Sequence, residues 1–148
     1  MTTGAWVLVA AVTLSAVFGG WRLRVDGRFR GAPVAEAPET PEEEPAPSLL
    51  ARTPYDDRLG ERATLLQFSS AFCAPCRTTR VVLADIAGVV PGVAHVEVDA
   101  EQHLDLVRRV GITRTPTTLV LDRAGHEVTR AAGAPTRQQV LTALAGTA

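Results

Sequence analysis

Both cysteines of the chain lie in one short stretch, SSAFCAPCRTTR, at residues 69–80. Cys73 and Cys76 are separated by Ala74 and Pro75. Two thiols at this spacing can act as a reversible redox pair, supply half of a metal site, or form a structural disulfide. A lone C-x-x-C beside a strand–helix pattern is typical of a redox centre rather than of a disulfide-rich scaffold.

A metal site and a structural disulfide are the two alternatives. A closed zinc site takes four ligands, usually from a second cysteine pair or from closely spaced histidines. His95, His103 and His126 have no such spacing, so we expect no metal. A disulfide across so short a loop removes little entropy from the unfolded chain, which makes a purely structural role the weaker explanation.

The residues around the cysteines predict how they are positioned. The apolar run at 63–70 (ATLLQFSS) is typical of a strand, and the apolar spacing of 77–90 predicts a helix that stops at Pro91. Cys73 then lies at the helix start, where the first N–H groups lack partners and the helix dipole favours negative charge. We therefore expect Cys73 to be the thiolate nucleophile.

The second cysteine lies one helical turn further along. Residues at i and i+3 of a helix are about 5–6 Å apart, which suits a disulfide. We expect Cys76 to attack a mixed disulfide formed at Cys73 and so to release the reduced substrate. Pro75 in the first turn favours the start of the helix.

The remainder of the chain predicts a mixed sheet covered by helices. Apolar periodicity predicts strand, helix, strand, strand and helix, in that order, at residues 93–99, 101–111, 117–122, 126–132 and 136–146. Gly111 is expected to end a helix, Gly125 to form a hairpin turn, and Thr136 to cap the last helix. Helical crossovers indicate parallel early strands, and the Gly125 turn indicates an antiparallel pair.

The stretch FCAPC resembles the W-C-G-P-C active site of thioredoxin-like proteins. The similarity continues through VGITRTPT to Gly125 and Gly133, and it covers roughly residues 60–146. The resemblance implies the α/β thioredoxin-like fold, with a mixed central β-sheet flanked by α-helices. It also implies exchange of disulfides with protein substrates and with an electron-donor or electron-acceptor protein. The Cys73–Cys76 disulfide is then the redox centre, no bound cofactor is needed, and we expect a monomer.

The resemblance also assigns the residues that contact a substrate. It implies a cis peptide bond between Thr115 and Pro116, which would let the Thr115 backbone pair with an extended substrate next to Cys73. The contact surface around the nucleophile would be shaped by Phe72, Ala74, Pro75 and Pro116.

Besides Phe72 and Ala74, which replace the tryptophan and glycine of the motif, two further positions near the cysteines depart from the family pattern. Gln67 stands where thioredoxins carry a buried aspartate beneath the second cysteine, and His95 stands where they often carry a lysine. An amide has no accessible proton equilibrium, so Gln67 can only form hydrogen bonds. Two interpretations of His95 stay open, namely polar support of its neighbours and participation in proton transfer.

The N-terminal residues 1–21 are predicted to be a transmembrane anchor. Ala5 to Trp21 is an uncharged apolar run close to the ~20 residues that cross a bilayer, and Trp6 and Trp21 suit its two interfaces. A buried soluble helix and a cleaved signal peptide are the alternatives, although a signal peptide has its basic residues before the apolar run. Here the basic residues follow it, which favours a cytoplasmic domain over an extracytoplasmic one: Arg22, Arg24, Arg28 and Arg30.

Residues 22–48 are predicted to be a basic flank and a linker to a folded domain at 49–148. The part at 31–48 holds five of the ten prolines and five glutamates, so it cannot bury enough apolar surface to fold. At ~3.1 Å per residue, a disordered tether from Arg22 to Leu49 could reach ~85 Å. The net charge of −1 gives no indication of a nucleic-acid partner.

Together these features predict a membrane-tethered thiol–disulfide oxidoreductase. The alternative is a redox sensor or protein-binding module that keeps the same fold but turns over little. The absence of a carboxylate at Gln67 is the feature that favours this alternative.

Overall fold

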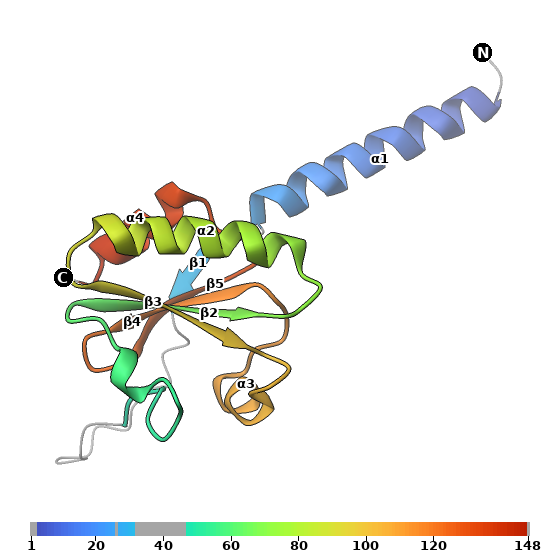
Figure 1. The fold of residues 1–148 in the computed structure, drawn as a ribbon. Coiled ribbons are helices and arrows are strands. Elements are labelled where there is room, and N and C mark those ends of the chain that lie inside the picture. The colour runs from blue at the N-terminus through green and yellow to red at the C-terminus, as the bar shows by residue number, and fades with distance from the viewer. Residues whose placement is uncertain (1–2, 26, 32–46, 148) are drawn as a thin grey trace, which may run out of the picture.

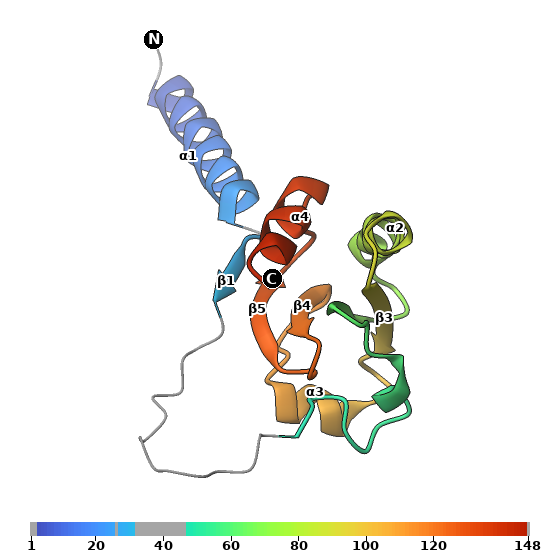
Figure 2. The same ribbon diagram turned by 90° about the vertical axis from the view of Figure 1, so that its left-hand side faces the viewer.

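The computed structural model describes residues 3–25, 27–31 and 47–147 of the chain. Its elements are α1 (Thr3–Val25), β1 (Phe29–Gly31), the 3₁₀ turn η1 (Asp56–Arg58), β2 (Ala63–Ser69), α2 (Ala74–Val89), β3 (Val93–Asp99), α3 (Leu104–Val110), β4 (Thr117–Asp122), β5 (Glu127–Ala132) and α4 (Arg137–Ala145). Figure 1 and Figure 2 show the sheet as a central layer, with α2 and α4 on one face and α3 on the other.

The sheet is mixed, as the sequence predicted. Its strands lie in the order β1-β5-β4-β2-β3, with β2 parallel to β3 and antiparallel to β4. The hairpin of β4 and β5 turns at Gly125, whose φ of 81° is a conformation that a residue with a Cβ rarely adopts. Strand β2, which leads to the cysteines, is buried along its whole length.

The two faces of β2 pack against different apolar clusters. Leu66 and Phe68 point into the cluster shared with α3, whereas Leu65 packs with residues of α2 and α4 such as Leu83 and Val140. Because side chains of a strand alternate between faces, Gln67 shares the α2 face with Leu65. The strand therefore places a polar amide directly beneath the helix that carries the cysteines.

Helix boundaries follow the predicted caps, with one exception. The αL conformation of Gly111 ends α3, and a capping box between Thr136 and Gln139 starts α4, both as expected. Helix α3, however, begins at Leu104 rather than at residue 101. The carboxylate of Asp99 accepts the N–H of Glu101 in a local turn, and this hydrogen bond competes with helix formation.

The segment at 22–48 differs from the continuous linker that the sequence predicted. Helix α1 continues to Val25, and Gly27 donates its N–H to Ala132 at 3.0 Å. Strand β1 then pairs antiparallel with β5, with Phe29 opposite Ala131. This pairing satisfies backbone groups that β5 would otherwise expose at a sheet edge, and Phe29 packs against the α2–α4 cluster. Most of the predicted Pro/Glu-rich linker, residues 32–46, lies outside the described residues.

The chain between residues 47 and 62 contributes to the core with little regular structure. Leu50 is fully buried, and the N–H of Leu49 donates to Gly125 at the β4–β5 turn. The one helix or strand element in this segment is the 3₁₀ turn η1.

Helix α1 projects away from the sheet (Figure 1). Its stretch Gly4–Arg22 is long and apolar enough to cross a membrane, and none of this stretch is buried against the rest of the described chain. A signal sequence near an N-terminus has the same length and composition.

Candidate redox site

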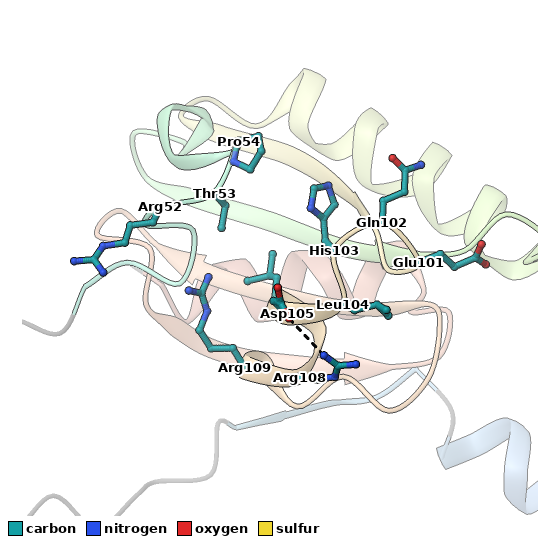
Figure 3. A pocket seen from close by; sticks show the side chains of 11 residues that line it. Arg52, Thr53, Pro54, Glu101, Gln102, His103, Leu104, Asp105, Arg108 and Arg109 are labelled. Atoms are coloured by element: carbon teal, nitrogen blue, oxygen red, sulfur yellow. Dashed lines mark hydrogen bonds and ion pairs between the residues drawn. The ribbon is translucent and has the colours of Figure 1, made fainter.

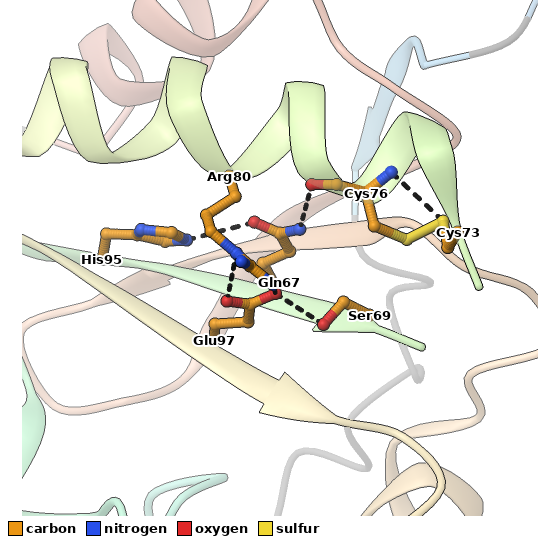
Figure 4. Close-up of polar contacts among 7 residues, drawn as sticks. All are labelled: Gln67, Ser69, Cys73, Cys76, Arg80, His95 and Glu97. Carbon is orange, nitrogen blue, oxygen red and sulfur yellow. Dashed lines mark hydrogen bonds and ion pairs between the residues drawn. A yellow bond between two sulfur atoms is a disulfide. The ribbon is translucent and has the colours of Figure 1, made fainter. Parts of the chain in front are cut away.

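The two cysteines form a disulfide at the start of α2. Their Cα atoms are 5.2 Å apart, and Cys73 is the N-cap residue of the helix. The backbone N–H of Cys76 donates to Cys73 Sγ at 3.1 Å (Figure 4). Because a first-turn N–H points at this sulfur, the helix start will stabilise a thiolate at Cys73 once the disulfide is reduced.

The two cysteines differ in their access to solvent. Cys73 is partly exposed, whereas Cys76 is only 1 % exposed. An incoming thiol or disulfide can therefore reach Cys73 far more easily than Cys76. The geometry suits an attacking residue at 73 and a resolving residue at 76.

The residues predicted to contact a substrate are neighbours of Cys73 in the chain or lie in the segment just before β4. Phe72 is fully exposed, and Ala74 and Pro75 are exposed as well. The Thr115–Pro116 bond is cis, as the resemblance implied. Ser70 and Thr115 share a hydrogen bond of 3.0 Å between their hydroxyl groups, which joins the Thr115 segment to the loop that leads to Cys73.

Gln67 is fully buried, and both polar atoms of its amide have a hydrogen-bond partner. Its Nε2 donates to the backbone carbonyl of Cys76 at 2.9 Å, and its Oε1 lies 3.2 Å from His95 Nε2 (Figure 4). The amide oxygen can only accept a hydrogen bond, so His95 carries its proton on Nε2. Burial lowers the pKa of His95, although the nearby charge of Glu97 acts in the opposite direction. The lowered pKa favours the neutral imidazole at pH 7.

These contacts place His95 beside Gln67. The amide in turn holds the backbone of Cys76. Gln67 and His95 thus form a chain of hydrogen bonds that supports the first turn of α2, and this is the polar-support interpretation of the two residues.

A second polar group, which the sequence analysis missed, lies next to this chain. Arg80 contacts both carboxylate oxygens of Glu97, with Nε–Oε2 and Nη2–Oε1 distances of 2.6 and 2.7 Å. Ser69 donates its hydroxyl to Glu97 Oε1 at 2.6 Å. Burial by itself would raise the pKa of Glu97, but the hydrogen bonds from Arg80 and Ser69 outweigh it and the pKa lies below its ordinary value.

Simple periodicity could have revealed this group. Ser69 follows Gln67 by two residues on β2, and Glu97 follows His95 by two on β3, so each pair shares the α2 face of the sheet. Arg80 follows Cys76 by four residues and therefore lies on the same side of α2. The parallel register also pairs Gln67 directly with Glu97.

A cavity of about 400 Å³ opens between these residues and the disulfide, and its lining includes both cysteines, Arg77 and Asp99. Another cavity, of about 550 Å³, lies between α3 and the turn at residues 52–54 and has no cysteine in its lining (Figure 3). Among the described residues, no group of three or more His, Cys, Asp or Glu side chains is arranged to hold a metal ion.

Several known proteins are similar to this chain in sequence. The sequence model of the Thioredoxin family matches residues 47–146, which is more than half of the chain. Thioredoxin H2-1 of Oryza sativa subsp. japonica is 33% identical over 73 residues, covering 49% of this chain and 52% of that protein. Thioredoxin of Chlamydia muridarum is 26% identical over 85 residues, covering 57% and 82%. The chain spans about half the length of the plant relatives it matches.

Solved structures of thioredoxins have the same fold. A mutant thioredoxin from Halobacterium salinarum superposes with a TM-score of 0.56 at 19% identity, covering 62% of this chain and 80% of that one. Thioredoxin from Fasciola hepatica superposes with a TM-score of 0.55 at 23% identity, covering 62% and 86%.

Proposed function

Because the chain belongs to the thioredoxin family, we propose that it is a thiol–disulfide oxidoreductase that acts on protein substrates through Cys73 and Cys76. One observation carries the proposal. The N–H of Cys76 donates to Cys73 Sγ at the start of α2, so the more exposed cysteine is also the one whose thiolate is stabilised.

The reduction of a substrate proceeds in two exchange steps. The Cys73 thiolate attacks one sulfur of the substrate disulfide, forms a mixed disulfide and displaces the other sulfur as a thiolate, which takes a proton from solvent. Cys76 then loses its proton to solvent and attacks Cys73 Sγ, and the second substrate sulfur leaves as a thiolate that takes up a proton. The substrate disulfide gains two electrons, and the two cysteine thiols become the Cys73–Cys76 disulfide.

The surface around Cys73 supports docking of an extended substrate. Phe72 supplies a fully exposed aromatic face, and the backbone of Thr115 before the cis bond can pair with a substrate strand. No bound cofactor takes part, because the disulfide itself is the redox centre. A protein dithiol or disulfide partner supplies or removes the electrons, and the protein works as a monomer.

The test is turnover by the full chain in detergent micelles. Wild-type protein should reduce an insulin-type disulfide at the expense of dithiothreitol, Cys73→Ser should abolish this turnover, and Cys76→Ser should accumulate a substrate mixed disulfide at Cys73. Reversible formation of the Cys73–Cys76 disulfide without substrate turnover would instead support the second candidate, a redox sensor or binding module. The specific observation in favour of that candidate is Gln67, which cannot ionise beneath Cys76.

We also propose that α1 is a single-pass membrane anchor. Its stretch Gly4–Arg22 has the required length and composition, and arginines follow the apolar run at positions 22, 24, 28 and 30. This charge distribution favours a cytoplasmic domain, with an extracytoplasmic domain as the alternative. Labelling of intact cells with a membrane-impermeant thiol reagent after mild reduction tests the sidedness, because only Cys73 and Cys76 can react. A cytoplasmic domain predicts no label until the cells are opened.

A further inference from the structure

The cavity of about 400 Å³ beside the disulfide has a distinctive charge arrangement. It is lined from β2, the loop before α2, α2 itself and β3, with Tyr55 added from the segment before η1, and both cysteine residues contribute to its wall. Arg80 and Glu97 line it too, but they neutralise each other in their ion pair. The charges left to a ligand are therefore those of the other two ionised residues in the wall, Arg77 and Asp99.

Among the described residues, neither of these two side chains has an oppositely charged partner. Within the part of the chain that the structure describes, Arg77 has no carboxylate partner. The carboxylate of Asp99 accepts a backbone N–H from Glu101 and an amide hydrogen from Gln102, both of them neutral donors. The wall thus offers one unpaired cation on α2 and one anion at the end of β3, beside a redox-active disulfide.

We propose that this cavity binds a low-molecular-weight zwitterionic thiol, such as cysteine or a short cysteine-containing peptide, and the corresponding disulfide. The ligand carboxylate contacts Arg77, its ammonium group contacts Asp99, and its sulfur meets Cys73. A free amino acid or a short peptide carries both charges close to its thiol, whereas a cysteine inside a protein chain carries neither. The size agrees, since small-molecule sites begin at about 300 Å³.

This proposal rests on the proposed redox function and adds a second class of reaction partner. The thiolate of one ligand attacks Cys73 Sγ, the disulfide breaks, and Cys76 leaves as a thiolate and takes up a proton. A second ligand thiolate attacks the ligand sulfur of the mixed disulfide and releases Cys73. Two ligand thiols lose two electrons and form one small disulfide, and the protein disulfide gains these electrons and becomes two thiols.

The test measures the rate at which four small thiols reduce the protein disulfide. The oxidised full chain in micelles is mixed with L-cysteine, cysteamine, 3-mercaptopropionate or 2-mercaptoethanol, quenched by alkylation, and analysed by mass. Rates are expressed per thiolate, and each variant is compared with wild type for the same thiol, so that differences in thiol acidity and nucleophilicity cancel. These thiols carry, respectively, both charges, only the cation, only the anion, and neither. We expect the rate with cysteine to saturate with concentration and the rate with 2-mercaptoethanol to rise linearly.

Two variants then connect each charge to its residue. Arg77→Gln should slow cysteine and 3-mercaptopropionate about fivefold, the loss expected for one partly exposed ion pair, and leave cysteamine unchanged. Asp99→Asn should slow cysteine and cysteamine and leave 3-mercaptopropionate unchanged. Arg123→Gln is the matched control, because Arg123 is exposed on the β4–β5 turn and outside the cavity lining.

This crossed pattern would not arise from a general change in the reactivity of Cys73. A linear dependence on cysteine concentration, or equal slowing of all four thiols in both variants, would overturn the proposal. Insulin turnover is measured on the same preparations. Its absence together with saturating cysteine kinetics would overturn the protein-substrate function and leave the small-thiol site supported.

Discussion

At the scale of single residues, the contacts of His95 favour one of its two interpretations. Its Nε2 lies 3.2 Å from Gln67 Oε1, and Gln67 holds the carbonyl of Cys76 rather than its sulfur. An imidazole whose proton is committed to an amide oxygen cannot pass that proton to a thiolate without breaking the hydrogen bond. The geometry therefore favours polar support over proton transfer.

We predict that His95→Ala leaves the pH profile of disulfide reduction unchanged in shape. The rate should fall less than about threefold, far below the roughly 10²-fold or more that removal of a proton-transfer group costs. The measurement is the insulin-reduction rate of the full chain between about pH 5.5 and 9, with His126→Ala as the matched control. Loss of one limb of the pH profile in His95→Ala, but not in His126→Ala, would show that His95 takes part in proton transfer.

Glu97 gives a prediction about stability at low pH. Hydrogen bonds from Arg80 and Ser69 lower its folded-state pKa, so the folded protein binds its proton less readily than the unfolded chain does. Its stabilising contribution is therefore present above the unfolded pKa of 4.5 and is lost as the pH falls through the lower folded value. Glu97→Gln cannot titrate and should lose less stability than wild type when the pH falls below 4.5.

Urea denaturation at pH 7, 4.5 and 3 measures this difference. Asp105→Asn is a suitable control, because its ion pair with Arg108 is highly exposed and contributes little. If wild type and Glu97→Gln lose stability in parallel between pH 4.5 and 3, the Arg80–Glu97–Ser69 group does not stabilise the fold in the way described.

At the scale of elements, strand β1 is the part of the fold that the sequence did not predict. Its pairing with β5 depends on Gly27, where there is no room for a side chain. Gly27 has a φ of +73°, and a Cβ on it would lie 2.3 Å from the carbonyl oxygen of Ala134. We predict that Gly27→Val separates β1 from β5 and leaves the disulfide intact. Hydrogen exchange should show faster exchange of the β5 amides that pair with β1, while β2 and α2 stay protected.

Gly88→Ala is the matched control, because its added Cβ meets nothing within 4 Å. Unchanged β5 protection in Gly27→Val would contradict the pairing.

The sequence predicted most elements because their signals are local. The apolar run of β2, the turn at Gly125 and the cap at Thr136 each depend on a few adjacent residues. Strand β1 has no such signal, since three residues of mixed character form a strand only because β5 presents an unpaired edge. Long-range pairing of this kind is a tertiary effect, whereas the periodicity of α2 and β3 could have placed Arg80 and Glu97 on facing surfaces.

The candidate site likewise has some features that the sequence predicted and others that it did not. Cys73, Cys76 and the cis bond at Pro116 were predicted because a short motif and a family pattern carry them. The charge arrangement of the neighbouring cavity depends on which side chains of several distant segments meet. No linear pattern shows that Arg77 and Asp99 both lack an oppositely charged partner within the described part of the chain.

At the scale of the whole molecule, the pairing of β1 changes how far the redox site can lie from a membrane. A disordered tether over residues 22–48 would let the domain move up to ~85 Å away. In the structure, α1 continues to Val25 and Gly27 already binds β5, so little chain separates the helix from the sheet. At about 1.5 Å per helical residue and about 3.3 Å per extended residue, Phe29 lies within roughly 20 Å of Arg22. If α1 is an anchor, the domain is held at the membrane surface, and its substrates must present their disulfides there.

We predict that this short connection gives efficient energy transfer between the domain and the lipid headgroups. A donor dye on Cys73 of the Cys76→Ser variant, reconstituted in vesicles with acceptor-labelled lipids, should show strong transfer. Adding Gly27→Val should lower the transfer, because the released domain then moves on the longer chain up to Leu49. Adding Gly88→Ala should leave it unchanged. Equal transfer with and without Gly27→Val would mean that β1 does not set the distance, and a Pro/Glu tether would then remain the better account of how the domain is attached.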